Sequence, residues 1–152
     1  MRLLLLTLSI VLLGSAANAQ TIAGPASVVD ANTIQINGEV IRFLDINAPE
    51  RNQVCSQALG DVEWECGQEA AFALIDWLGT SSVTCEVDGV DQYQRHLARC
   101  NVGGEDIASW LAESGWAMPY GDCACEGVRA ASARAAAAGR GIWIEPFILP
   151  WD

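Results

Sequence analysis

The sequence contains no lysine, and eight arginines face 19 aspartates and glutamates, for a formal net charge of −11 at pH 7. Nucleic-acid-binding proteins generally carry a basic surface, because neutralising phosphates supplies most of their affinity. A chain this acidic repels polyanions unless arginines gather locally or a bound cation reverses the field. Composition therefore argues against a broad nucleic-acid-binding surface.

Long hydrophobic runs are missing as well. The longest, residues 3–13, offers about 11 apolar positions, whereas a helix needs roughly 20 to cross a bilayer. Arg2 precedes this run, and Ala17-Asn18-Ala19 follows it as an A-x-A cleavage pattern. We therefore predict a signal peptide over 1–19 and a mature domain over 20–152, periplasmic or secreted and not attached to a membrane. The mature domain has seven arginines against 19 acids, a formal charge of −12.

Histidine is nearly absent, since His96 is the single one in the sequence. Zinc sites usually need C-x-x-C or Cys/His groupings, and the chain has neither. Its six cysteines are an even number, and an exported chain meets an oxidising compartment, so we predict disulfides instead. The cysteines are Cys55, Cys66, Cys85, Cys100, Cys123 and Cys125.

Hydrophobic periodicity predicts the order of the structural elements. Alternating or β-rich segments indicate strands at 22–29, 33–36, 39–46, 82–87 and 94–102. Asn37-Gly38, between the second and third strands, is typical of a type I′ hairpin turn. Apolar residues at helical spacing predict helices at 68–79, 106–114 and 126–138. This order predicts an α+β fold: a five-stranded OB-type barrel with a helix inserted after the third strand.

The predicted strands suggest how the cysteines pair. Cys85 and Cys100 fall on two strands that flank a turn at Asp88-Gly89, so we predict a bond between them. A bond from Cys55 to Cys66 would brace the segment just after Glu50. Cys123 and Cys125 remain, and a bond across a single residue is strained and rare, so this third pairing stays open.

Three motifs appear in order along the mature chain. They are Val29-Asp30-Ala31-Asn32-Thr33, the segment IRFLDINAPE over 41–50, and DQYQRHLA over 91–98. Together they resemble the staphylococcal nuclease (thermonuclease-like) family, whose members typically read V-x-D-G-D-T, I-R-L-x-G-I-D-A-P-E and D-x-Y-G-R-x-L-A. The resemblance covers nearly the whole mature chain and implies a five-stranded OB-fold barrel with three helices.

The resemblance also implies a reaction, because family members cut nucleic-acid phosphodiesters with a calcium ion. Arg42 and Arg95 match the two phosphate-binding arginines, and Glu50 matches the glutamate that activates or orients the attacking water. Guanidinium forks suit charge on phosphate oxygens, and a nearby carboxylate can direct a water proton. From residue types alone, an ion-pair network among these three residues is the alternative.

The resemblance implies calcium ligands at two positions where this chain departs from the family pattern. Both metal-ligand aspartates are replaced here, by Asn32 and Asn47, and calcium affinity depends on the charge of its oxygen ligands. Asp30 and Asp45 lie nearby. Asp45 is two residues from Asn47, about 6–7 Å along a regular strand, so it rescues the site only if the backbone bulges. We expect weak calcium binding at most, and inefficient hydrolysis.

Smaller features complete the expectations. Ala31 and Gln94 stand where family members have loop glycines, which restricts the backbone there. Tyr93 lies inside a matched motif and is a candidate for stacking on a base, whereas Tyr120 is expected to pack. We expect His96 to be structural. The arginines on the last helix, Arg129, Arg134 and Arg140, are expected to form ion pairs rather than a phosphate-binding face.

Three functional hypotheses follow from these residues. The chain is a calcium-dependent nuclease with an altered metal site, a non-catalytic relative that binds single-stranded nucleic acid or a nucleotide phosphate, or an interaction protein with a vestigial cleft. The acidic charge and the paired asparagines favour the second and third hypotheses over the first.

Overall fold

The computed structural model describes residues 20–57 and 60–144. The predicted signal peptide, 1–19, lies outside the described residues. Within the described ranges, no helix combines the length and apolar character that crossing a membrane requires.

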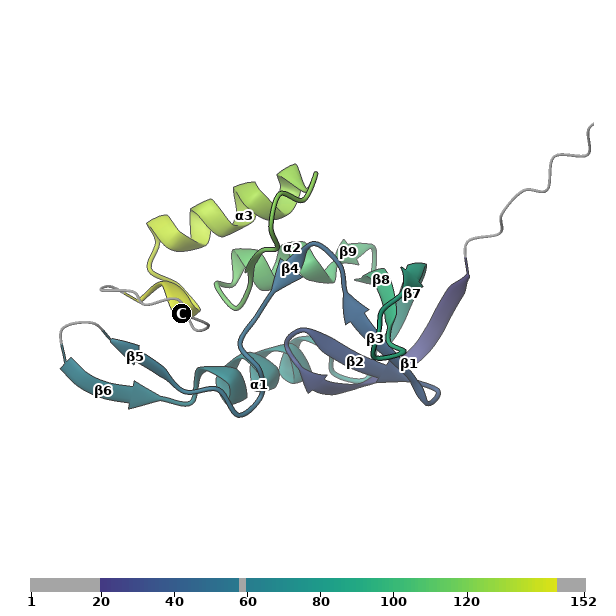
Figure 1. Cartoon of the computed structure of the whole chain (residues 1–152), viewed down its shortest axis with the longest axis horizontal. Helices are drawn as coiled ribbons and strands as arrows, with labels where there is room; N and C mark the ends of the chain where they lie inside the picture. The colour runs from purple at the N-terminus through teal and green to yellow at the C-terminus, as the bar shows by residue number, and fades with distance from the viewer. Residues whose placement is uncertain (1–19, 58–59, 145–152) are drawn as a thin grey trace, which may run out of the picture.

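Five strands close into a barrel. They are β1 (Thr21–Asp30), β2 (Thr33–Ile36), β3 (Glu39–Phe43), β7 (Ser82–Val90) and β8 (His96–Val102). The sheet runs β3-β2-β1-β7-β8, and a parallel pairing of β3 with β8 joins its two edges. Figure 1 shows these strands gathered at one end of the molecule. The predicted five-stranded α+β barrel is confirmed.

The sequence explains why the first hairpin forms. Ile34 and Ile36 of β2 and Ile41 of β3 are all fully buried, so alternate residues of both strands face the barrel interior. Asn37 and Gly38 join the strands with φ values of 52° and 89°. Positive φ at both turn residues is the type I′ geometry that Asn-Gly favours.

There are three helices among the described residues: α1 (Cys66–Leu78) and α2 (Ile107–Glu113) pack on the barrel, and α3 (Glu126–Ala137) packs on α2. The buried side of α1 includes Ala71, Leu74 and Leu78 at the predicted helical spacing, whereas Ile75 of the same pattern is exposed. At the start of α2, the Asp106 side chain accepts a hydrogen bond from the Ser109 backbone N–H at 2.7 Å. In Figure 1, α3 lies above α2, while α1 lies lower, beside the first strands.

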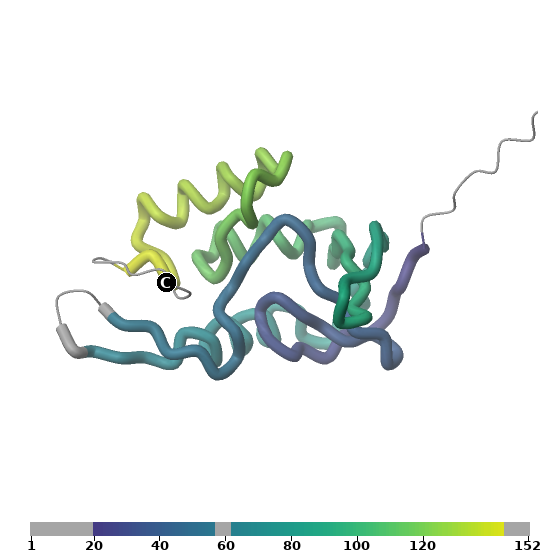
Figure 2. The backbone as a smooth tube through the Cα atoms, in the orientation of Figure 1, coloured from purple at the N-terminus to yellow at the C-terminus, as the bar shows by residue number. Residues whose placement is uncertain are grey.

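Several short elements were not predicted from the sequence. They are β4 (Ile46–Asn47), β5 (Cys55–Gln57), β6 (Gly60–Trp64), β9 (Glu105–Asp106), β10 (Met118–Pro119) and a 3₁₀ turn, η1 (Gly141–Trp143). β4 pairs with β10, and β5 pairs with β6. Figure 2 shows the chain arching away from the barrel after β3, through β4, and descending toward the β5–β6 hairpin. Strands of two or three residues are too short to show a clear period.

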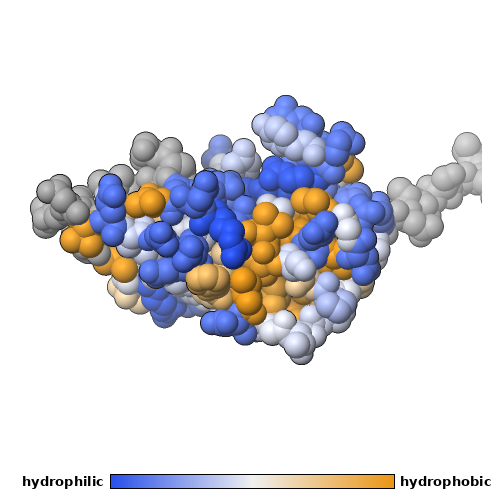
Figure 3. Space-filling view, turned by 90° about the horizontal axis from the view of Figure 1, so that it is seen from below, coloured by the Kyte–Doolittle hydropathy of each residue, from blue (hydrophilic) through white to orange (hydrophobic). Residues whose placement is uncertain are grey.

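Seen from below, the surface of the molecule mixes hydrophilic and hydrophobic residues (Figure 3). Val29 of β1 and Phe72 of α1 are both exposed. Arg51 lies between these elements: its guanidinium donates to the Val29 carbonyl at 3.0 Å and stands 5.7 Å from the centre of the Phe72 ring. Arg51 therefore ties the loop after Glu50 to β1 and α1.

Disulfide bonds are present, as the even number of cysteines predicted. Cys85 lies directly opposite Cys100 on β7 and β8, and the two are bonded. Cys55 is bonded to Cys66, which fixes β5 against the start of α1. Cys123 is bonded to Cys125, the pairing that the sequence left open.

The lengths of the closed loops predict how much each disulfide stabilises the domain. Replacing Cys85 and Cys100 by alanine opens a loop of 15 residues and should cost about 3 kcal/mol of unfolding free energy. The matched control, Cys123→Ala with Cys125→Ala, opens a separation of only 2 residues and should cost less than about 2 kcal/mol. Urea denaturation of both variants tests this, and equal losses would contradict it.

Candidate functional site

A cleft of about 450 Å³ opens where β3 and β4 meet the loop before β8. Its walls bring together Arg42, Glu50 and Arg95, the three residues predicted to act on a phosphate. The motifs that carry them are far apart in sequence. They meet because β3 pairs with β8, with Arg42 opposite Leu97. Their catalytic role stays a prediction.

Arg42 forms the inner wall of the cleft. Its guanidinium donates to the backbone carbonyls of Phe43 and Ile46, the latter at 3.0 Å, and to Asn47 Oδ1 at 3.3 Å. Burial and the nearby charge of Arg95 lower the pKa of Arg42, against an opposing effect of nearby acids. Two guanidinium groups that repel each other across a partly buried cleft favour an anion between them.

The loop Asp91–Arg95 positions the second arginine. The Asp91 carboxylate accepts hydrogen bonds from the backbone N–H groups of Tyr93 and Arg95, at 2.9 and 3.0 Å, and from Arg95 Nε at 2.8 Å. Desolvation alone would raise the pKa of Asp91, but these hydrogen bonds outweigh it and lower that pKa. Asp91 is therefore held as a carboxylate that fixes the Arg95 side chain.

Ala31 and Gln94 stand where family members have loop glycines, and only one of the two has a strained backbone. Gln94 has a φ of 64°, in the left-handed region that favours glycine. Ala31 has a negative φ and is fully buried. The expected restriction thus applies to the loop that carries Arg95 and not to the turn after β1.

Close packing against α1 fixes Glu50. A Cβ atom on Gly67 would lie 1.7 Å from the Glu50 carbonyl oxygen, so only glycine allows this approach. The Gln53 side chain accepts from the Glu50 backbone N–H at 3.0 Å, and the Gln53 carbonyl accepts from the Gly67 N–H at 3.2 Å. Neither Gly67 nor Gln53 was predicted to support the site, because their partners are set by tertiary structure.

The carboxyl groups of Glu50 and Asp30 lie close together. Desolvation, and then the charge and hydrogen bonding of Asp30, raise the pKa of Glu50. Arg42 and Arg95 act in the opposite direction and are outweighed. Asp30 itself is only 6% exposed at the end of β1. The pair forms an acidic floor beside the two arginines.

Asn32 makes a two-point contact that the sequence did not reveal. Its side chain is 1% exposed; Nδ2 donates to the Ala48 carbonyl at 2.6 Å, and Oδ1 accepts from the Ala48 N–H at 2.7 Å. Asn47, the second substituted position, accepts from Arg42 through its amide oxygen. Both amide oxygens thus already have protein donors.

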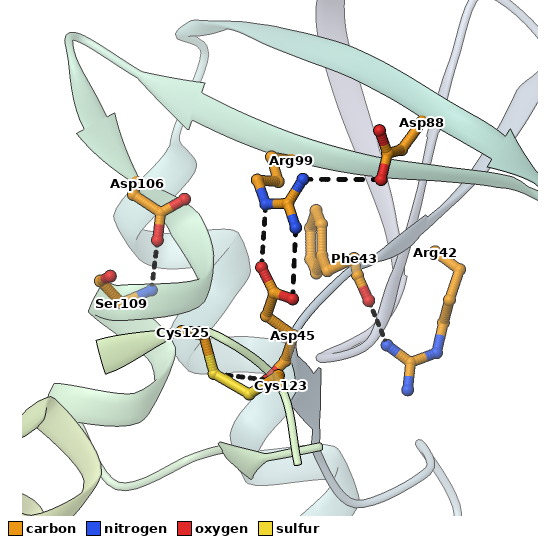
Figure 4. Close-up of polar contacts among 9 residues, drawn as sticks. All are labelled: Arg42, Phe43, Asp45, Asp88, Arg99, Asp106, Ser109, Cys123 and Cys125. Atoms are coloured by element: carbon orange, nitrogen blue, oxygen red, sulfur yellow. Dashed lines mark hydrogen bonds and ion pairs between the residues drawn. A yellow bond between two sulfur atoms is a disulfide. The ribbon is translucent and has the colours of Figure 1, made fainter. Parts of the chain in front are cut away.

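Asp45, the other candidate for rescuing a metal site, is held in an ion pair with Arg99. Arg99 Nε and Nη2 donate to its two carboxylate oxygens at 2.9 and 3.4 Å, and Figure 4 shows Asp45 pointing toward Arg99. The backbone of Asp45 is irregular, with a φ of 68°, but its carboxylate serves this ion pair.

These contacts do not fit a calcium site. Calcium takes six to eight oxygen ligands, with affinity set by their charge. Here both asparagine oxygens accept hydrogen bonds, Asp45 pairs with an arginine, and the raised pKa of Glu50 disfavours its charged form. Across the described part of the chain, His, Cys, Asp and Glu side chains form no group of three or more that could hold a metal ion.

Two exposed tyrosines flank the cleft. Tyr93 is 71% exposed and Tyr120 is 64% exposed, and both line it. The expectation that Tyr120 packs against the protein is wrong, because its side chain is exposed at the cleft. Pairing of β10 with β4 brings Tyr120 to the site, where its backbone N–H donates to the Asp45 carbonyl at 2.9 Å. Nothing in the hydrophobic pattern marks this two-residue pairing.

The remaining arginines and the histidine lie elsewhere. Arg134 and Arg140 both pair with Glu113, as expected of ion pairs on the last helix. Arg129 differs from this expectation, because it donates to the backbone carbonyls of residues 121 and 123. His96 bonds to Glu39 at 2.9 Å.

Comparison with known proteins agrees with this geometry. The family model described as "Staphylococcal nuclease homologue" matches residues 40–145, a span that includes Arg42, Glu50 and Arg95. The chain is also similar to the succinoglycan biosynthesis protein ExoI of Rhizobium meliloti (strain 1021). The two are 40% identical over 131 residues, which cover 84% of this chain and 68% of that protein.

The left-handed conformation of Gln94 predicts a stabilising substitution. Gln94→Gly removes the strain without losing packing, because this side chain is exposed, and should raise the unfolding free energy by about 0.5–1 kcal/mol. The matched control is Gln92→Gly, at an exposed position without positive φ, which should lower it by about 0.5–1 kcal/mol. Chemical denaturation compares the two, and a loss of stability in both would contradict the assignment.

The raised pKa of Glu50 predicts a pH dependence of stability. A carboxyl whose pKa is higher in the folded state stabilises fully below its unfolded pKa of about 4.3, and that contribution is lost as pH rises through the folded value. Glu50→Gln imitates the protonated form at every pH. The variant should therefore match the wild type near pH 4 and exceed its stability near pH 8. A difference that does not change with pH would refute this.

Proposed function

This chain belongs to the staphylococcal nuclease family, and on that premise we propose that it is an exported domain that binds a phosphate ester between Arg42 and Arg95, with weak or no nuclease activity. The observation that carries the proposal is the cleft itself. Two guanidinium groups line it, although the chain as a whole is strongly acidic. Guanidinium groups pair with phosphate oxygens through directed, charge-assisted hydrogen bonds.

The cleft suits one phosphate better than a long polyanion. Arg42 and Arg95 lie beside Glu50 and Asp91 in the same walls, so positive potential is confined to a small volume. A formal charge of −11 on the chain repels a duplex at longer range, and salt screens that repulsion only partly. A single-stranded segment or a nucleotide, with a base against Tyr93 or Tyr120, satisfies both constraints.

Weak hydrolysis follows from the state of the groups around the cleft. Family members use calcium to stabilise charge at the reacting phosphate, and the oxygen atoms at the corresponding positions here already accept protein hydrogen bonds. Losing about 4 kcal/mol of transition-state stabilisation slows a reaction roughly a thousandfold. Glu50 could still accept a water proton, but only when it is ionised, and its raised pKa opposes that.

An active nuclease with an altered metal site is the second candidate. One observation favours it: the fold assembles all three predicted catalytic residues in a single cleft. This candidate requires cleavage of single-stranded DNA or RNA that a chelator abolishes, whereas the first candidate requires binding without such cleavage.

Two further parts of the proposal concern location and ligand. Three disulfides agree with an oxidising compartment, which supports export to the periplasm or the medium. ExoI is named for succinoglycan biosynthesis, so a sugar phosphate belongs beside nucleotides among the ligands tested.

Calorimetric titration with a nucleoside monophosphate and a sugar phosphate tests the proposal. Arg95→Ala should weaken binding at least about tenfold, because a charge-assisted hydrogen bond is lost. The charge-matched control is Arg134→Ala, which removes an exposed arginine paired with Glu113 and should leave the affinity nearly unchanged. A parallel assay on single-stranded DNA with calcium or a chelator should show little cleavage. Rapid, chelator-sensitive cleavage by the wild type would favour the second candidate instead.

A further inference from the structure

Asn32 uses every polar group it has to join three parts of the site. Its backbone N–H donates to Asp30 Oδ1 at 2.8 Å, and its carbonyl accepts from the Phe43 N–H at 2.9 Å. Its side-chain amide donates to the Ala48 carbonyl and accepts from the Ala48 N–H. A buried residue with all four groups bonded is held firmly in place, and holds its neighbours.

The residues that Asn32 joins stand next to the functional groups. Phe43 follows Arg42 on β3, and Ala48 lies two residues before Glu50. Asp30, whose carboxyl lies close to that of Glu50, accepts a hydrogen bond from Asn32 itself. The turn between β1 and β2 is thereby tied to both the arginine and the glutamate of the cleft.

The contact with Ala48 needs an amide and not a carboxylate. One side-chain atom must donate and the other must accept, and an ionised aspartate only accepts. In Asn32→Asp, one carboxylate oxygen would face the Ala48 carbonyl oxygen in place of a hydrogen bond of 2.6 Å. The new charge would also lie near Asp30, whose carboxylate oxygen accepts from the Asn32 backbone N–H at 2.8 Å.

We infer that Asn32 is a positioning residue whose amide performs the bridging that a cation and its ligands would otherwise provide, so that the cleft binds phosphate without a divalent ion. This inference rests on the proposed phosphate-binding function. The asparagine at position 32 then belongs to a functional anion site and is not the remnant of a lost metal site. The inference also implies that restoring aspartate there damages the site.

The test measures the affinity for inorganic phosphate and the melting temperature of the mature protein, each with calcium or with a chelator. For the wild type, both quantities should be the same in the two conditions. Asn32→Asp should weaken phosphate binding at least about tenfold and lower the melting temperature by about 5 °C, with no recovery on adding calcium.

Two control variants separate positioning from charge and from stability. Asn52→Asp adds the same charge at an exposed position two residues from Glu50 and should leave both quantities nearly unchanged. Ile107→Val removes a methylene from the core of α2 and should lower the melting temperature by a few degrees while leaving the phosphate affinity intact.

The outcomes distinguish this inference from the proposed function. A wild type that binds no phosphate overturns the proposed function, and the inference with it. Phosphate binding that strengthens with calcium, a calcium-dependent rise in the wild-type melting temperature, or an Asn32→Asp variant that keeps its affinity overturns the inference alone. Calcium-dependent cleavage gained by Asn32→Asp would do the same.

Discussion

The two hydrogen bonds between the Asn32 side chain and the Ala48 backbone link parts of the chain that the barrel alone does not connect. β4 and the loop after it lie outside the five-stranded barrel, and they carry Asn47 and Glu50. Asn32 holds this segment from the β1–β2 turn, while Gly67 receives the Glu50 backbone from the side of α1. The position of the acidic group in the cleft depends on these two contacts together.

Electrostatics explains why such precise placement matters in this chain. The chain is strongly acidic, and the two neighbouring guanidinium groups of Arg42 and Arg95 create a local site that favours an anion. Asp91 fixes Arg95, and backbone carbonyls fix Arg42, so neither guanidinium has to become ordered when an anion binds. Burial and the nearby Asp30 raise the pKa of Glu50, which favours its neutral form beside the site. A compact and pre-organised anion site is therefore compatible with an acidic surface.

Most of the fold could be predicted from the sequence, because the barrel strands and α1 carry regular apolar periods and the Asn37-Gly38 turn has a specific geometry. The short pairings β4–β10 and β5–β6 could not be predicted. The position of Tyr120 depends on the first of them, so it could not be predicted either. The motifs predicted which residues meet in the cleft. They could not predict that the Asn32 side chain bonds to Ala48. The sequence at position 32 shows only that a charged side chain is replaced by a neutral one. Its hydrogen-bond partner lies 16 residues away and comes close only in the folded backbone.

The asparagine at position 32 can be explained in two ways. In one, Asn32 is the remnant of a metal site; in the other, its amide is an integral part of a cleft that works without calcium. The most direct measurement is the NMR signal of the Asn32 side-chain amide during a calcium titration. Our account predicts that its chemical shift and its slow hydrogen exchange do not change, because both amide groups are bonded to Ala48. A saturable shift with loss of that protection would show that the amide oxygen binds the ion, and would contradict the account.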